Sequence, residues 1–255
     1  MERLTLLFIV VFSFFSCISN SDKKNVDYQN VPSIIIDTGH GSVTSIIIDV
    51  GHGGDDNGAV VTHRIADKLI TFREKDMSLR IAKALAACLS EKLPETEIVL
   101  TRTEDVLISK EERVIKSIQA AINNSRVIFV SIHLNYNSNR NISGFEVYYY
   151  LPPLLDTDDY INDPYLEDTI RNNSSLAQYI LTAIGDIPEL KDLSRSIKTD
   201  DYFVLKNAVC PSVLIECGYL SNKDEALLLN TDSYIEKLVE GIALGIEYFI
   251  NADND

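Results

Sequence analysis

The stretch SIIIDTGHGSVTSIIIDVGHGG, residues 33–54, contains nearly the same motif twice. Ser33–Gly41 reads SIIIDTGHG, and Ser45–Gly53 reads SIIIDVGHG. A short β-branched run that is bounded by a glycine-rich turn is typical of a buried strand. The stretch therefore predicts a core strand that leads into a polar loop. Only one of its histidines, His40 or His52, can occupy that place in the fold.

Beyond this stretch, apolar runs of strand length alternate with segments of helical spacing. Strands are predicted at Ile46–Asp49, Glu97–Thr101, Val127–Ile132, Gly144–Leu151, Tyr202–Leu205 and Ser212–Glu216. Helices are predicted at Asp76–Lys92, Ser109–Asn123, Ser174–Ile184 and Tyr234–Ile250, with Asp76 as an N-cap. Such alternation indicates an α/β fold. We expect a single α/β domain whose central sheet, mostly parallel or mixed, is flanked by helices.

The first residues, MERLTLLFIVVFSFFSCISN, are typical of an export signal. Arg3 provides a positive start, and the apolar stretch Leu6–Phe15 is shorter than a typical membrane span. The Ser16-Cys17 pair is similar to a bacterial lipoprotein signal, which favours lipidation of Cys17 over simple cleavage nearby. Either outcome predicts an exported protein in the periplasm or cell envelope.

The rest of the chain divides by composition. Residues 1–19 are the predicted signal segment, residues 20–44 a polar tether with the first motif copy, and residues 45–252 the folded domain. Within that domain, residues 152–173 are acidic and lack a clean period, which predicts an insertion or long loop. This insertion could be a lid over a functional cleft or a solvated surface loop.

The formal net charge of −15 argues against a nucleic-acid partner, because such binding neutralises phosphates with Lys and Arg. A net charge far from zero keeps a protein soluble, and we attribute the charge of this chain to that role. Three cysteines follow the signal segment, and an odd number gives no complete disulfide framework. Cys88 and Cys217 are predicted to be buried free thiols.

Polar side chains follow three of the predicted strands. His52, His133 and Glu216 stand at these ends, and Glu74 precedes a helix. Ligands of α/β sheets bind beyond the carboxyl ends of strands. Two histidines and a carboxylate form a catalytic zinc set, and a further carboxylate could act as general base. Each residue alone is more often structural, but a buried carboxylate is costly without a partner, so the combination favours a metal site.

Six segments carry a resemblance to a known family. They are IIIDVGHGGDDNGAV, EKDMSLRIAKALAACL, VLTRTEDVLISKEERV, FVSIHLNYNS, GFEVYYY and PSVLIECGYLSNKDEALLL. In this order they resemble the zinc-dependent N-acetylmuramoyl-L-alanine amidases of family 3, which cleave bacterial peptidoglycan. The resemblance implies that residues 45–252 are a catalytic domain.

The resemblance also implies roles for the strand-end residues. His52, Glu74 and His133 match the ligands of Zn²⁺, and Glu216 matches the catalytic glutamate. Asp49 is either a group that orients a ligand or an ordinary strand-end residue. Asn135 could contact substrate or stabilise a turn.

The family motif selects the second copy of the duplicated stretch. Its continuation is found only after His52, as Gly54, Asp55, Gly58 and Ala59. After the first Gly-His-Gly stand Ser42, Val43 and Thr44 instead. His52 is therefore predicted to be functional. His63 is predicted to be a solvated loop residue.

The resemblance implies peptidoglycan as the partner, leaves room for a regulatory envelope protein, and limits membrane contact to a lipid anchor at Cys17. Two other functions stay open. A zinc peptidase that cuts within stem peptides could use the same ligands. A non-catalytic peptidoglycan-binding module would be expected to lack one of the four residues, and all four are present.

Overall fold

The computed structural model describes residues 43, 45–123, 126–152, 164–190, 192–193 and 195–252. Its centre is a six-stranded sheet in the order β4-β1-β5-β8-β6-β7. The strands are β1 (Ser45–Val50), β4 (Glu97–Leu100), β5 (Val127–Asn135), β6 (Phe145–Tyr149), β7 (Arg195–Thr199) and β8 (Ser212–Tyr219). All neighbours run parallel except β6 and β8, which are antiparallel. The mixed sheet confirms the expected fold class.

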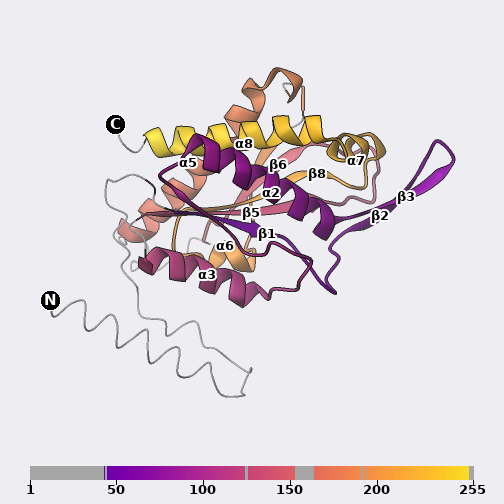
Figure 1. Cartoon of the computed structure of the whole chain (residues 1–255). Helices are drawn as coiled ribbons and strands as arrows, with labels where there is room; N and C mark the ends of the chain where they lie inside the picture. Colours follow the sequence, from indigo (N-terminus) through magenta and orange to yellow (C-terminus); the bar gives the residue numbers. More distant parts are fainter. Residues whose placement is uncertain are drawn as a thin grey trace, which may run out of the picture. The chain divides into compact units, whose positions relative to one another are not determined.

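Helices cover both faces of this sheet (Figure 1). On one face lie α2 (Glu74–Lys92), α5 (Pro164–Asp186) and α8 (Asp232–Ala252), and on the other α3 (Lys110–Asn123) and α6 (Phe203–Lys206). A 3₁₀ turn (η2, Pro188–Leu190) and helix α7 (Lys223–Leu229) complete the helical elements of the described residues. No helix among these residues has the length and apolar character needed to cross a membrane.

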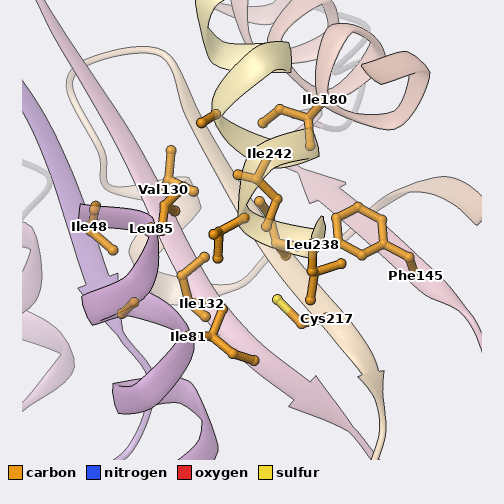
Figure 2. Close-up of a cluster of buried hydrophobic side chains, with 14 of the residues drawn as sticks. Ile48, Ile81, Leu85, Val130, Ile132, Phe145, Ile180, Cys217, Leu238 and Ile242 are labelled. Carbon is orange, nitrogen blue, oxygen red and sulfur yellow. The ribbon is translucent and has the colours of Figure 1, made fainter. Parts of the chain in front are cut away.

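The larger core lies between the sheet and the face formed by α2, α5 and α8 (Figure 2). Apolar side chains from strands and helices interdigitate there, including those of Ile48, Val130, Ile132, Ile81, Leu85, Ile180, Leu238 and Ile242, all buried. Burying one such side chain stabilises the fold by roughly 1.5–3 kcal/mol. Helices α5 and α8 approach each other very closely at Gly245. A Cβ at this position would lie only 2.3 Å from the Ile180 Cα, so the contact requires glycine.

The strand register aligns the polar strand ends. Asp49 on β1 is paired with Ser131 on β5, and His133 on β5 is paired with Glu216 on β8. Because these parallel strands end at the same edge, their polar residues meet there. The core packing of the apolar runs thus fixes the position of the site.

Two sequence predictions about helices are wrong. Asp76 is not the N-cap of α2, which begins at Glu74 with Arg73 as its cap. Strand β3 (Lys68–Arg73) leads directly into this helix, and the Glu74 N–H donates to the Ala59 carbonyl. Tyr202–Leu205 is not a strand, because Phe203–Lys206 forms α6. A short apolar run does not distinguish a strand from a helical turn.

The predicted long loop at residues 152–173 is also wrong for its second half. Helix α5 begins at Pro164, ten residues earlier than predicted. Proline suits a first helical turn because its missing N–H would have no partner there. Asn173 is buried in this helix, and its Oδ1 accepts a 2.7 Å hydrogen bond from the Ser212 N–H.

The hairpin of β2 (Val60–Ile65) and β3 has no counterpart among the predicted elements. Its two turn residues, Ala66 and Asp67, both have positive φ, as a type I′ hairpin turn requires. Cys217 is buried as predicted, whereas Cys88 is only half-buried. The signal segment, Cys17, the tether with His40, and residues 153–163 of the acidic insertion lie outside the described residues.

Candidate metal centre and active site

Three predicted site residues converge at the edge of the sheet. His52 lies in the loop after β1, His133 on β5, and Glu74 in the first turn of α2. Glu74 Oε1 lies 2.9 Å from both His52 Nε2 and His133 Nδ1. The imidazole rings stand edge to face, with centroids 4.9 Å apart. One ligand atom from each residue lies within 4.8 Å of the others, so the group could hold a metal ion.

The chemistry of these donors fits a divalent transition metal. Two imidazole nitrogens and one carboxylate are a ligand set of catalytic zinc sites, which leave a further position open. The first-turn position of Glu74 and the strand-end position of His133 are both rigid, because helix and sheet hold their main chains. The donors of Glu74 and His133 are therefore fixed by the fold.

Glu74 is held as an ionised carboxylate. Burial opposes its charge, but hydrogen bonds from His133 and His52 keep its pKa well below the usual range. Its Oε2 accepts a 2.8 Å bond from the Ala59 N–H, and its Oε1 a 3.1 Å bond from the Leu134 N–H. These bonds orient the carboxylate towards the two histidines.

His52 is oriented by Asp56. The His52 Nδ1 lies 2.9 Å from the Asp56 Oδ2, while the Asp56 Oδ1 accepts a bond from the Gly58 N–H. Burial opposes a charge on the His52 ring, but Glu74 and Asp56 together raise its pKa. The sequence analysis noted Asp55 as part of the family motif, and it did not find Asp56, the aspartate that contacts His52.

Gly58 is required by the close packing of this loop. Its φ is +60°, and a Cβ there would lie 2.5 Å from the Glu74 Oε2 and 2.6 Å from the His52 Cδ2. In the Gly-Ala pair of the motif, Gly58 leaves room for the Glu74 and His52 side chains. Ala59 provides the main-chain N–H that binds Glu74.

Two buried arginines, which the sequence analysis missed, fix the loop after β1. Arg113 donates to the Asp49 Oδ1 at 2.6 Å and to the His52 carbonyl at 2.9 Å. Arg102 donates to the Gly51 carbonyl and the Lys75 carbonyl, both at 2.8 Å. They could not be found by pattern, because their bonds to the Gly51 and His52 carbonyls span 51 and 61 residues of sequence.

Asp49 is fully buried below the metal group. It accepts hydrogen bonds from Thr101, Ser131 and Arg113. Since Arg113 also holds the His52 carbonyl, Asp49 is linked to His52 through Arg113. The described contacts include no direct bond from Asp49 to a ligand side chain.

Glu216 on β8 faces the same cleft as the three converging residues, a cavity of about 410 Å³. Its Oε2 is buried and has no hydrogen-bond partner within the described part of the chain. Burial raises the pKa of Glu216 well above its usual value, and the charges of Glu74 and Glu146 add to this. A buried, unpaired carboxylate that faces a cleft is available to accept a proton from a bound molecule.

Glu146, opposite Glu216 on β6, is by contrast fully bonded. It accepts from Lys198, Tyr219, Asn135 and Tyr148 at 2.6–3.0 Å. Asn135 therefore has a structural contact, and its Oδ1 also accepts from the Tyr136 N–H.

His63 is not a solvated loop residue, as the sequence analysis predicted. It lies on β2, is buried, and its Nε2 is 2.8 Å from the Leu220 carbonyl oxygen. Its ring also packs against Phe72. The prediction was wrong because the hairpin that carries His63 was not expected.

Residues 46–248 match the profile of the Amidase_3 family, N-acetylmuramoyl-L-alanine amidase. The chain belongs to this amidase family. The match spans β1 to α8 and includes all four predicted site residues. The family assignment made from the sequence motifs is thereby confirmed.

Two relatives show how much of this chain is shared with known proteins. The chain is 32% identical over 216 residues to an endolysin of Bacillus phage SPP1, covering 85% of this chain and 65% of that protein. It is 29% identical over 243 residues to the amidase AmiC of Escherichia coli O6:H1, covering 85% of this chain and 52% of that protein. The chain thus spans between half and two thirds of the length of these relatives.

The fold also matches solved amidase structures. The catalytic domain of CwlV, an N-acetylmuramoyl-L-alanine amidase from Bacillus (Paenibacillus) polymyxa var. colistinus, superposes with a TM-score of 0.64 and 27% identity. The alignment covers 82% of this chain and 99% of that domain. The described α/β unit therefore corresponds to a whole amidase catalytic domain.

Proposed function

We propose that this protein hydrolyses the amide bond between the lactyl group of N-acetylmuramic acid and the L-alanine of the stem peptide in peptidoglycan. Zn²⁺ would be held by His52, Glu74 and His133, with Glu216 as the general base. The observation that carries the proposal is the convergence of three donor atoms within 4.8 Å, beside a buried and unpaired carboxylate in one cleft. Membership of the amidase family supports the choice of bond.

The zinc ion would supply polarisation of the amide carbonyl and acidification of a water molecule. Glu216 accepts the proton of the attacking water at its unpaired Oε2. The same carboxyl group then passes this proton to the nitrogen of L-alanine as the carbon–nitrogen bond breaks. The products are a lactyl carboxylate and a stem peptide with a free amino terminus, so atoms and charge balance.

Residues 45–252 would form the catalytic domain, and residues 1–44 an export signal and tether that place it in the cell envelope. Lipidation at Cys17 would attach it to a membrane. A regulatory envelope partner remains part of this proposal. These assignments are supported by the apolar stretch near the start of the chain and by the nature of the substrate.

Mass spectrometry of digested sacculi tests the proposed bond. Free stem peptides with an intact N-terminal L-alanine are expected from the wild-type protein, and none from Glu216→Gln. Fragments cut between amino acids would instead identify a peptidase. Binding to sacculi with no release of peptide would indicate a non-catalytic module.

A further inference from the structure

The cleft is lined by more acidic than basic side chains, and its two basic residues, Arg113 and Lys110, differ in their contacts. Its lining includes Asp56, Glu74 and Glu216 as acids and Arg113 and Lys110 as bases. Arg113 is buried and engaged with Asp49 and three main-chain carbonyls. Lys110 is exposed and has no ion pair with any residue that the structure describes. Lys110 is therefore the cleft cation that is free to meet a ligand.

Helix α3 places Lys110 beside Arg113, the arginine that holds the loop of His52. Lys110 and Arg113 are three residues apart on α3 and so share one face of this helix, with Cβ atoms about 5–6 Å apart. Arg113 reaches the His52 carbonyl at 2.9 Å. Lys110 thus stands about one helical turn from the arginine that holds the His52 carbonyl, and both residues line the cleft.

Neighbouring acids on α3 do not neutralise Lys110. Glu111 is adjacent in sequence, and adjacent helix residues do not face each other. Glu112 exchanges hydrogen bonds with Ser109 in a capping box at the start of the helix. Lys110, which lines the cleft, is therefore left without an acidic partner among the described residues.

We propose that Lys110 binds a carboxylate of the stem peptide and makes the enzyme selective for it. This inference rests on the proposed function. In an intact glycan strand the lactyl carboxyl group is tied up as the amide, so the carboxylates near the scissile bond belong to the stem. The residue after L-alanine is γ-linked glutamate, whose α-carboxylate is free unless amidated.

A pair of muramyl peptides that differ only in this group provides the test. One carries γ-linked glutamate with a free α-carboxylate, and the other carries the α-amide. Wild-type protein is expected to have a kcat/KM about tenfold higher for the free carboxylate, since a charged hydrogen bond contributes on this scale. The difference should lie in KM, because the contact is the same in the ground state and the transition state.

The variant Lys110→Ala should lose this preference, and Lys110→Arg should keep most of it. Lys116→Ala on the same helix is the matched control, because Lys116 does not line the cleft. The preference should also weaken at high salt. A Lys110→Ala variant that still prefers the free carboxylate tenfold would overturn the inference.

Two further arms separate the other outcomes. Inhibition by free N-acetylmuramic acid tests whether Lys110 instead binds the lactyl carboxylate of the product. The inference would be overturned if this compound inhibited Lys110→Ala more weakly than the wild type while the variant kept its preference for the free stem carboxylate. Calorimetric binding of both substrates to Glu216→Gln needs no turnover. If the wild type cleaves neither substrate, the proposed function fails, and the binding comparison alone decides the role of Lys110.

Discussion

Removing the Asp56 side chain is expected to weaken metal binding without unfolding the domain. The Asp56→Ala change deletes the 2.9 Å contact to His52 Nδ1 and the 3.1 Å bond from the Gly58 N–H. The main-chain bridge between Gly53 and Asp56 does not depend on the side chain and should persist. The imidazole then loses the group that fixes its orientation and tautomer.

The size of the effect can be bounded from the structure. Loss of such a supporting contact lowers metal affinity by about 10- to 100-fold, or about 1.4–2.8 kcal/mol. The Asp56 side chain is 52% exposed, so water can replace part of the interaction. We therefore expect a loss near tenfold, and a smaller one for Asp56→Asn, which keeps an acceptor oxygen.

Competition with a chromophoric chelator measures the zinc affinity. Asp55→Ala is the matched control, since Asp55 is adjacent and exposed and makes no side-chain hydrogen bond with the described residues. Unfolding midpoints of both variants should stay close to that of the wild type. Equal zinc affinities for Asp56→Ala, Asp55→Ala and wild type would refute the reasoning.

Three further predictions test other parts of the site. Glu216→Gln should bind zinc normally yet lose about 10²- to 10⁴-fold in kcat; an empty site in metal analysis would mean that Glu216 is a ligand. Gly58→Ala should lose both zinc and activity, because the new Cβ would crowd Glu74; a fully loaded, active variant would contradict this. Burial raises the pKa of Glu225 from 4.5 to about 7, so folding favours its protonated form, and the free energy of unfolding of wild type relative to Glu225→Gln should fall as pH rises through this range. Parallel curves in pH-dependent denaturation would show that Glu225 does not titrate this way.

The elements predicted well from the sequence are those whose burial dictates their composition. Strands β1, β5 and β8 are buried on both faces and read as continuous apolar runs. Helix α8 has a clear apolar face that includes Ile242 and Ile246. Edge strand β7 was missed because its sequence, RSIKT, is mostly polar and none of its residues is fully buried.

The predictability of the site follows the same division. His52, His133 and Glu216 could be found because each follows an apolar run, and Glu74 because it is a carboxylate just before a predicted helix. The contact of Asp56 with His52 could not be predicted, because only the fold decides which of two adjacent aspartates turns back to the histidine. Arg113 could not be predicted, because its contacts with Asp49 and His52 join segments that only the sheet brings together.

Metal analysis of two histidine variants tests the central claim most directly. His40 and His52 occupy nearly identical motifs, but only His52 lies beside Glu74 and His133 in the described structure. Inductively coupled plasma mass spectrometry should find equimolar zinc in the wild type and in His40→Ala, and little in His52→Ala. Zinc retained in a folded His52→Ala, or lost from His40→Ala, would contradict the assigned centre.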